Sequence, residues 1–171
     1  MKTDAAVLLE PRKPLRILTV TLPKLDSGQV LVDVAYTGVC RTQILEIKGQ
    51  KGIDPYLPHT LGHEGSGIVL EIGSNVTKVK PGDHVVMSWI KGVGNEVSST
   101  RYESQEGPIN SGPISTFLGQ AIVSESRVTK IPNNMPLLEA ALLGCAIPTG
   151  ADIIFNMLDL GATSSIAIFG V

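Results

Sequence analysis

Two cysteines and an adjacent histidine–glutamate pair are the residues of this chain best suited to chemistry. Cys40 ends the apolar stretch 30–39, and His63 and Glu64 lie side by side between glycines. Cys145 follows a glycine near position 150, and the chain contains 2 cysteines in all. Two thiolates, an imidazole and a carboxylate are ligands that suit Zn²⁺. We therefore take Cys40, His63, Glu64 and Cys145 as candidate metal ligands.

The spacing of these residues separates two kinds of zinc site. A structural site usually takes its ligands from close pairs such as C-x2-C, because a small loop folds around the ion. Here the ligands come from three distant stretches, so the site can form only after the fold brings them together. Cys40, His63 and Cys145 would leave a fourth position for water, substrate or Glu64. An open position is typical of a catalytic zinc.

Four short motifs that carry or separate these residues resemble those of the zinc-containing, medium-chain alcohol dehydrogenases. They are Gly38-Val39-Cys40-Arg41-Thr42, Gly62-His63-Glu64-Gly65-Ser66-Gly67, Val79-Lys80-Pro81-Gly82-Asp83-His84-Val85 and Gly144-Cys145-Ala146-Ile147-Pro148-Thr149-Gly150. They occur in the family's order, at about its spacing, and cover nearly the whole chain. The resemblance implies one catalytic zinc and reversible oxidation of a small-molecule alcohol to an aldehyde or ketone. The hydride acceptor would be NAD or NADP.

The same resemblance implies roles for further residues. Thr42 matches the hydroxyl that relays the substrate proton, and Glu64 matches a conditional zinc ligand close to the catalytic centre. Arg41 and Thr149 are candidate cofactor-binding residues, and Trp89 matches an aromatic residue of the substrate pocket.

Each of these residues also has a simpler interpretation. The cysteines could be small buried apolar residues, and His63 a turn histidine. Thr42 could cap a helix, Arg41 could be solvated, and Trp89 could belong to the core. The remaining histidines, His59 and His84, are predicted to be surface or structural residues.

Two positions depart from the family's pattern. A histidine that follows the relay hydroxyl in some relatives is here Leu45, so the proton must leave by another route. An aspartate that often supports the zinc histidine is here Gln43. The Gln43 amide oxygen could accept the same hydrogen bond, but without the negative charge.

The chain is predicted to be mainly β with a few short helices. Strands are expected over 5–9, 15–20, 29–37, 67–73, 83–89, 120–123 and 128–131, and helices over 41–48, 136–143 and 147–158. Short strands with turn signals about every ten residues favour a compact barrel or sandwich. The resemblance sharpens this to a GroES-like β-barrel.

The segment 91–117 is predicted to form an irregular lobe. Many relatives carry four cysteines there that bind a second, structural zinc, whereas this chain has no cysteine between Cys40 and Cys145. One zinc is therefore expected, and the lobe must be held by packing or remain mobile.

The C-terminal stretch predicts a further domain. Residues 163–171 are typical of a buried strand that leads into a glycine turn, as at the start of a dinucleotide-binding unit. We expect residues 1–146 to form the GroES-like catalytic domain. Residues 147–171 would form a linker helix and the first strand of a truncated nucleotide-binding (Rossmann) domain. The chain would then be a fragment of a longer homo-oligomeric enzyme, inactive without the nicotinamide that the missing domain holds.

Composition excludes several other classes. The formal net charge of −2 offers no basic surface for nucleic acid or acidic membranes, and no apolar run approaches the length of a membrane span. Two cysteines cannot make a disulfide framework, which favours a cytoplasmic location. Two alternatives remain. One is a zinc-independent enzyme of the same superfamily, like the quinone reductases, and the other is a non-catalytic GroES-like binding domain stabilised by zinc.

Overall fold

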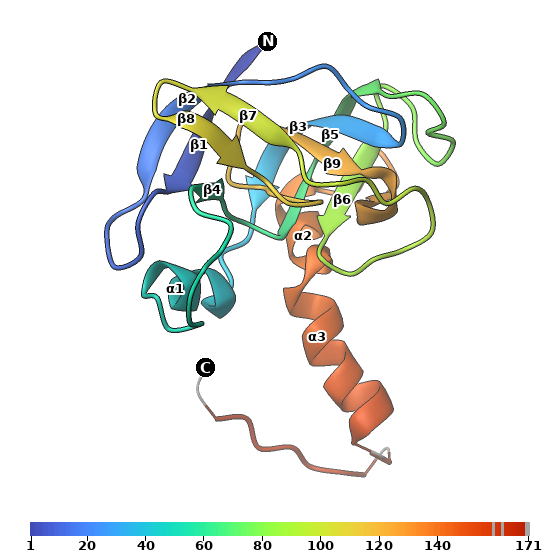
Figure 1. The fold of residues 1–171 in the computed structure, drawn as a ribbon. Coiled ribbons are helices and arrows are strands. Elements are labelled where there is room, and N and C mark those ends of the chain that lie inside the picture. The colour runs from blue at the N-terminus through green and yellow to red at the C-terminus, as the bar shows by residue number, and fades with distance from the viewer. Residues whose placement is uncertain (159, 162, 170–171) are drawn as a thin grey trace.

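The computed structural model describes residues 1–158, 160–161 and 163–169. Its strands form two groups, a small closed barrel in the order β1-β2-β7-β8-β4 and a five-stranded sheet in the order β10-β6-β5-β3-β9 (Figure 1). The barrel strands are β1 (Lys2–Leu8), β2 (Arg16–Thr21), β4 (His59–Thr60), β7 (Arg101–Ser104) and β8 (Gly107–Asn110). The sheet strands are β3 (Gln29–Thr37), β5 (Glu64–Ile72), β6 (His84–Ser88), β9 (Gln120–Ser124) and β10 (Val128–Lys130).

One apolar core is shared by the barrel and the sheet. Alternate residues of the strands point inward, so that Val7, Val20, Val30 and Val32 are 0% exposed. Tyr102 of β7 is also 0% exposed. Its hydroxyl accepts a hydrogen bond from the Ile122 N–H of β9 at 2.9 Å, which joins the two groups of strands across the core.

The predicted fold class is confirmed, and each of the seven predicted strands is present within a few residues of its expected bounds. The prediction for 91–117 was wrong in part, because β7 and β8 form a hairpin there. Each of these strands has four residues and buries one apolar side chain, Tyr102 or Ile109. So short an alternation leaves almost no periodic signal in the sequence.

The helices lie at the ends of the strands that build the site. They are α1 (Arg41–Ile47), α2 (Leu137–Ala140) with the 3₁₀ turn η2 (Ala141–Gly144), and α3 (Ala146–Asp152) with the π-helical turn η3 (Ile153–Met157). A short 3₁₀ turn, η1 (Glu125–Arg127), connects β9 to β10. All three predicted helices are therefore present. The second changes from α to 3₁₀ before Cys145.

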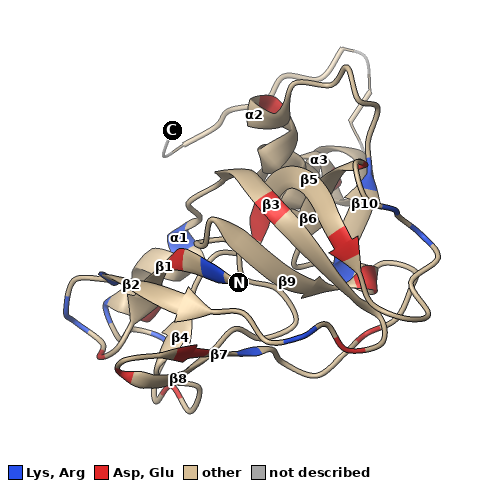
Figure 2. Ribbon diagram, turned by 90° about the horizontal axis from the view of Figure 1, so that it is seen from above, with Lys and Arg blue, Asp and Glu red and all other residues tan. Residues whose placement is uncertain are grey.

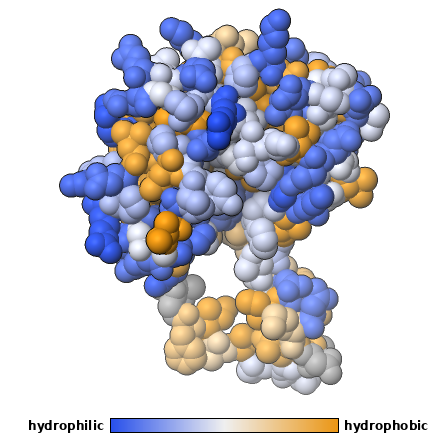
Figure 3. Space-filling model, in the orientation of Figure 1, coloured by the Kyte–Doolittle hydropathy of each residue, from blue (hydrophilic) through white to orange (hydrophobic). Residues whose placement is uncertain are grey.

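The strand predicted over 163–171 is absent from the residues that the structure describes. Residues 163–169 are exposed and form no strand, and 170–171 lie outside the described residues. A strand needs a neighbour to satisfy its N–H and C=O groups, and the described part of the chain offers none here. Residues 153–169 leave several apolar side chains exposed, among them Phe155 and Phe169 (Figure 3).

Acidic and basic residues are both spread over the barrel and the sheet, as Figure 2 shows. No single helix of the described residues is long and apolar enough to cross a membrane. Leu137–Gly144 and Ala146–Met157 reach that length and composition together, but they meet at a 54° bend.

Candidate metal centre

The structure brings three of the four predicted ligands together. One ligand atom from each of Cys40, His63 and Cys145 lies within 4.8 Å of the others. Cys40 directly precedes α1, His63 directly precedes β5, and Cys145 lies between η2 and α3. Both cysteines are free thiols. Residues that are 23 and 82 positions apart along the chain thus form one cluster by folding alone.

Cys40 is presented by the first turn of α1. It is the N-cap residue, with extended backbone angles of φ −87° and ψ 153°. Its N–H donates to the Gln43 side-chain oxygen at 3.0 Å, as in a capping box. The preceding strand end is fixed as well, because Gly38 N–H and the Thr37 hydroxyl both donate to the Glu64 carbonyl oxygen, at 3.2 and 3.0 Å.

Cys145 is brought to the site by the close approach of η2 to the sheet. A side chain at Gly144 would place its Cβ 2.2 Å from the Met87 carbonyl oxygen, so only glycine fits. The Ser88 hydroxyl donates to the Gly144 carbonyl oxygen at 2.6 Å and holds this contact. The glycine before Cys145 is therefore a positional requirement of the site.

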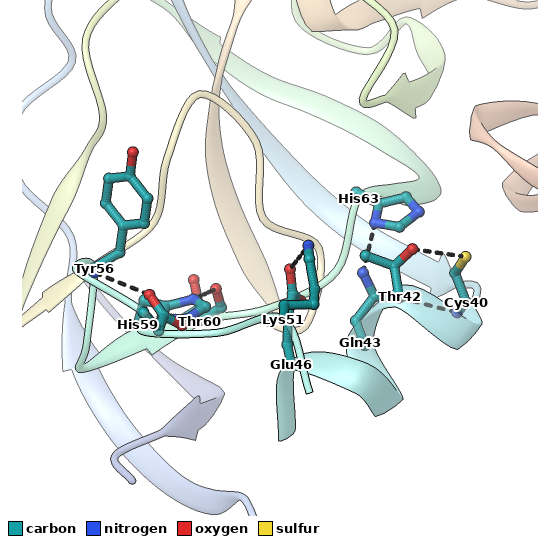
Figure 4. A network of polar contacts seen from close by, with 10 residues as sticks. Cys40, Thr42, Gln43, Glu46, Lys51, Tyr56, His59, Thr60 and His63 are labelled. Carbon is teal, nitrogen blue, oxygen red and sulfur yellow. Dashed lines mark hydrogen bonds and ion pairs between the residues drawn. The ribbon is translucent and has the colours of Figure 1, made fainter. Parts of the chain in front are cut away.

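His63 is held from one side by Gln43. Its Nδ1 lies 2.5 Å from the Gln43 side-chain nitrogen, which leaves Nε2 on the side of Cys40 (Figure 4). Burial lowers the pKa of His63, against the opposing effect of the Glu64 and Glu46 carboxylates. A lowered pKa keeps the imidazole neutral at physiological pH, and the neutral ring is the form that binds metals.

The environment of Cys145 disfavours its thiolate when no cation is bound. Burial raises the pKa of this thiol, and the Cys40 thiol and the Glu64 carboxylate add to the increase. Hydrogen bonds with the side chains of Thr149 and Trp89 oppose it. A divalent cation would reverse this balance, since it stabilises coordinated thiolates directly. The donor set and its electrostatics therefore fit a thiophilic metal ion such as Zn²⁺.

Glu64 lies beside the cluster but is not part of it. Its side chain is buried, and Oε2 accepts a hydrogen bond from Ala146 N–H, the first residue of α3, at 3.1 Å. Gly38 leaves room for it, because a Cβ there would lie 2.6 Å from the carboxyl carbon. In this arrangement Glu64 positions the backbone next to Cys145. Its conditional role as a fourth ligand stays a prediction.

The other predicted site residues surround the cluster at different distances. Thr42 Oγ1 lies 3.7 Å from Cys40 Sγ, and Thr149 Oγ1 lies 3.9 Å from Cys145 Sγ. Trp89 is 50% exposed, so it is not a core residue, and its side chain helps to lower the pKa of Cys145. Arg41 is exposed on the first turn of α1.

The two remaining histidines lie outside the cluster. His59 is hydrogen-bonded to the Asp54 carboxylate at 2.8 Å and to the Thr60 carbonyl oxygen at 2.9 Å (Figure 4). His84 belongs to β6, and its buried Nδ1 has no hydrogen-bond partner among the described residues. The contacts of His59 fit a structural histidine, whereas the role of His84 stays a prediction.

A second polar cluster, which the sequence did not indicate, holds the lobe beside the sheet. Glu125 is 1% exposed, and its Oε1 accepts hydrogen bonds from Thr77 N–H at 2.6 Å and Lys78 N–H at 2.9 Å. Its Oε2 accepts from the N–H and the side-chain amide of Asn95, at 2.9 and 2.6 Å. Burial alone would raise the pKa of Glu125, but these hydrogen bonds lower it from 4.5 to about 2. We call this cluster the Glu125 hub.

Comparisons with known proteins agree with this geometry. Residues 26–133 match the family model for the alcohol dehydrogenase GroES-like domain. The chain is 33% identical over 198 residues to the S-(hydroxymethyl)glutathione dehydrogenase of Escherichia coli, covering all of this chain and 53% of the relative. The chain thus spans about half the length of the curated relatives it matches.

Solved structures give the same result. An alcohol dehydrogenase zinc-binding domain protein from Burkholderia ambifaria superposes with a TM-score of 0.77 at 27% identity, covering 92% of this chain and 49% of the other. The benzyl alcohol dehydrogenase of Acinetobacter calcoaceticus superposes with a TM-score of 0.76 at 28% identity, covering 93% and 49%. The family match, which covers more than half of the sequence, and these superpositions show that the chain belongs to the GroES-like catalytic domains of the alcohol dehydrogenase family.

Proposed function

We propose that this chain is the catalytic domain of a zinc-dependent alcohol dehydrogenase. The reaction is the reversible oxidation of a small-molecule alcohol to an aldehyde or ketone, with NAD or NADP as the hydride acceptor. The observation that carries the proposal is the convergence of Cys40, His63 and Cys145 within 4.8 Å. The named alcohol dehydrogenases among the similar proteins support the reaction class.

One zinc ion would be held by Cys40 Sγ, His63 Nε2 and Cys145 Sγ. When bound, such an ion acts as a Lewis acid that acidifies an alcohol, in the way that it lowers the pKa of a bound water molecule to about 7. Both thiols must then be deprotonated, and the raised pKa of Cys145 makes that step dependent on the metal. In the absence of the ion, burial favours the neutral forms of His63 and Cys145.

The surrounding side chains would move the proton and shape the pocket. The Thr42 hydroxyl can both accept and donate a hydrogen bond, so it can take the substrate proton and pass it on. Its place beside Cys40 Sγ puts it at the edge of the cluster. Trp89, which is half exposed and affects the pKa of Cys145, would form an apolar wall for the substrate carbon chain.

The cofactor would be bound largely by protein outside residues 1–146. Arg41 and Thr149 are exposed near the cluster and would contact it from this side. We propose that residues 1–146 are the catalytic domain and that 147–171 begin the nucleotide-binding domain. On this proposal, the 171-residue chain alone binds zinc but does not turn over substrate, and the complete enzyme is cytoplasmic and homo-oligomeric.

Metal content and activity test the proposal in two steps. The purified chain should contain one zinc, measured by elemental analysis, and Cys40→Ser and Cys145→Ser should each lose it. The gene's complete product should oxidise primary or secondary alcohols with NAD or NADP, and the same substitutions should abolish this activity. A zinc-free chain whose complete product reduces quinones would overturn the proposal in favour of the zinc-independent reductases.

A further inference from the structure

Both ends of the Gln43 side-chain amide are engaged at the metal centre. The side chain is 2% exposed, with Oε1 3.0 Å from the Cys40 nitrogen and Nε2 2.5 Å from His63 Nδ1. The backbone N–H of Cys40 can only donate, so the atom that faces it must be the amide oxygen. The amide nitrogen is therefore the atom that faces His63 (Figure 4).

This orientation determines where the proton of His63 resides. An amide NH₂ group donates hydrogen bonds and cannot accept them, so Nδ1 must be the acceptor and carry no proton. A neutral imidazole then holds its proton on Nε2, the ring nitrogen on the side of Cys40. A metal ion needs the lone pair of that same nitrogen. The proton and the metal thus compete for one atom.

We propose that Gln43 is a positioning residue that holds His63 in the Nε2-protonated tautomer, so that metal capture requires an exchange of tautomers. The proton leaves Nε2 and a proton is taken up at Nδ1, with no net change. The new Nδ1–H then needs an acceptor, which Gln43 supplies only if its oxygen turns away from Cys40. This inference rests on the proposed zinc site.

The exchange couples the metal centre to the start of α1. The Gln43 oxygen serves either the Cys40 N–H or the His63 Nδ1–H, because the two donors lie at opposite ends of the amide. A metal-bound His63 therefore leaves the N-cap of α1 without its hydrogen bond. The loss of this hydrogen bond adds to the cost of the tautomer exchange. Metal affinity is therefore lower than in a site where residue 43 offers two acceptor oxygens.

Gln43→Glu is the sharpest variant, because it replaces one nitrogen by oxygen at unchanged length. A carboxylate can accept from Cys40 N–H with one oxygen and from His63 Nδ1–H with the other. We expect zinc affinity to increase about tenfold or more, measured by competition with a chromophoric chelator. Gln50→Glu adds the same charge at an exposed position just beyond α1 and should change affinity by less than about twofold, since exposed charges are screened. Equal affinity gains in both variants would overturn the proposal.

The tautomer itself can be read directly from the wild-type chain. In metal-free protein, ¹⁵N chemical shifts of the His63 ring should show a bare Nδ1 and a protonated Nε2. A His63→Asn variant identifies the signals. Addition of zinc to the wild-type chain should give a protonated Nδ1. In the Gln43→Glu variant, Nδ1 should be protonated even without metal. A protonated Nδ1 in the metal-free wild type would refute the proposal. The metal-free measurement is independent of zinc binding, so an absence of zinc would count against the proposed function alone.

Discussion

The metal centre and the Glu125 hub both bring polar groups from distant segments together, but the protein stabilises the charge of Glu125 and disfavours the charge of Cys145. Both join segments that are distant in the sequence, but Glu125 is buried whereas Cys40 and His63 are half-buried. The hub is complete, because one carboxylate receives five hydrogen bonds from Thr77, Lys78 and Asn95. At the metal centre burial raises the pKa of Cys145, and the Cys40 thiol and the Glu64 carboxylate add to the increase, whereas the hydrogen bonds of the hub lower the pKa of Glu125.

The contrast is the one expected between a structural cluster and the proposed metal site. A hub whose charge is already balanced by the protein contributes to folding and binds nothing further. Ligands held together without a balancing charge are the usual sign of a site prepared for a cation or a reaction. The hub also explains how the lobe is held without a second zinc. Glu125 connects segments 77–78 and 95 to the end of β9, and Glu96 adds an ion pair with Arg127.

The largest expected effect is the loss of zinc binding when a ligand of the metal centre is replaced, because the Glu125 hub does not depend on metal. Cys145→Ser should abolish stoichiometric zinc binding, because a hydroxyl is a poor ligand where a thiolate is needed. The barrel should stay folded, since the strands place the site and not the reverse. Circular dichroism and urea unfolding of the metal-free chain should change by about 1 kcal/mol or less. A melted barrel would instead mark the zinc as structural.

Glu125→Gln should have the converse effect. The amide keeps the shape of the carboxylate but turns one end into a donor, which then faces the donors of Asn95. We expect a loss of about 3 kcal/mol in the free energy of unfolding, with zinc affinity unchanged. Glu71→Gln, at an exposed position of β5, is the matched control and should change stability by less than about 0.5 kcal/mol. Lost zinc binding in folded Glu125→Gln protein would show that the two clusters are coupled.

Acid should weaken the hub in a defined range of pH. The pKa of Glu125 is about 2 in the folded chain against an ordinary value of 4.5, so its ionisation stabilises the fold above about pH 5. That contribution, about 3 kcal/mol by linkage, is lost as the pH falls from 5 towards 2. The free energy of unfolding, measured in urea across this range, should fall less steeply in Glu125→Gln than in wild type. Parallel curves would mean that other carboxylates dominate acid unfolding.

The two clusters also differ in how far the sequence predicted them. The convergence of Cys40, His63 and Cys145 followed from motifs that contain their own positional residues, such as Gly144 before Cys145. The hub has no comparable signal. Its main donors are backbone N–H groups 30 to 48 residues away from Glu125, and a backbone group carries no side-chain identity.

The strands also show how far the sequence predicts the structure. Long strands such as β3 were predicted because several buried residues alternate along them. The β7–β8 hairpin was missed because Tyr102 and Ile109 alone carry its pattern. The strand expected over 163–171 is absent from its described residues, 163–169, for a different reason, since its apolar composition is suitable but the described chain gives it no neighbour to pair with. Propensity can suggest a strand, but pairing decides whether one forms.

Replacement of Trp89 should have the smallest effect, and it tests how far the protein itself influences the charge of Cys145. Its side chain helps to lower the pKa of Cys145 against burial, which makes it one of the few protein groups that favour the thiolate. Trp89→Phe keeps an aromatic wall but removes the indole N–H donor. We expect zinc affinity to fall by about threefold to tenfold, with more alkaline pH needed for metal uptake, because deprotonation of Cys145 becomes harder. Stability should change little, since the side chain is 50% exposed. Zinc titrations at several pH values measure this shift, and an unchanged profile would show that the metal alone determines the charge of Cys145.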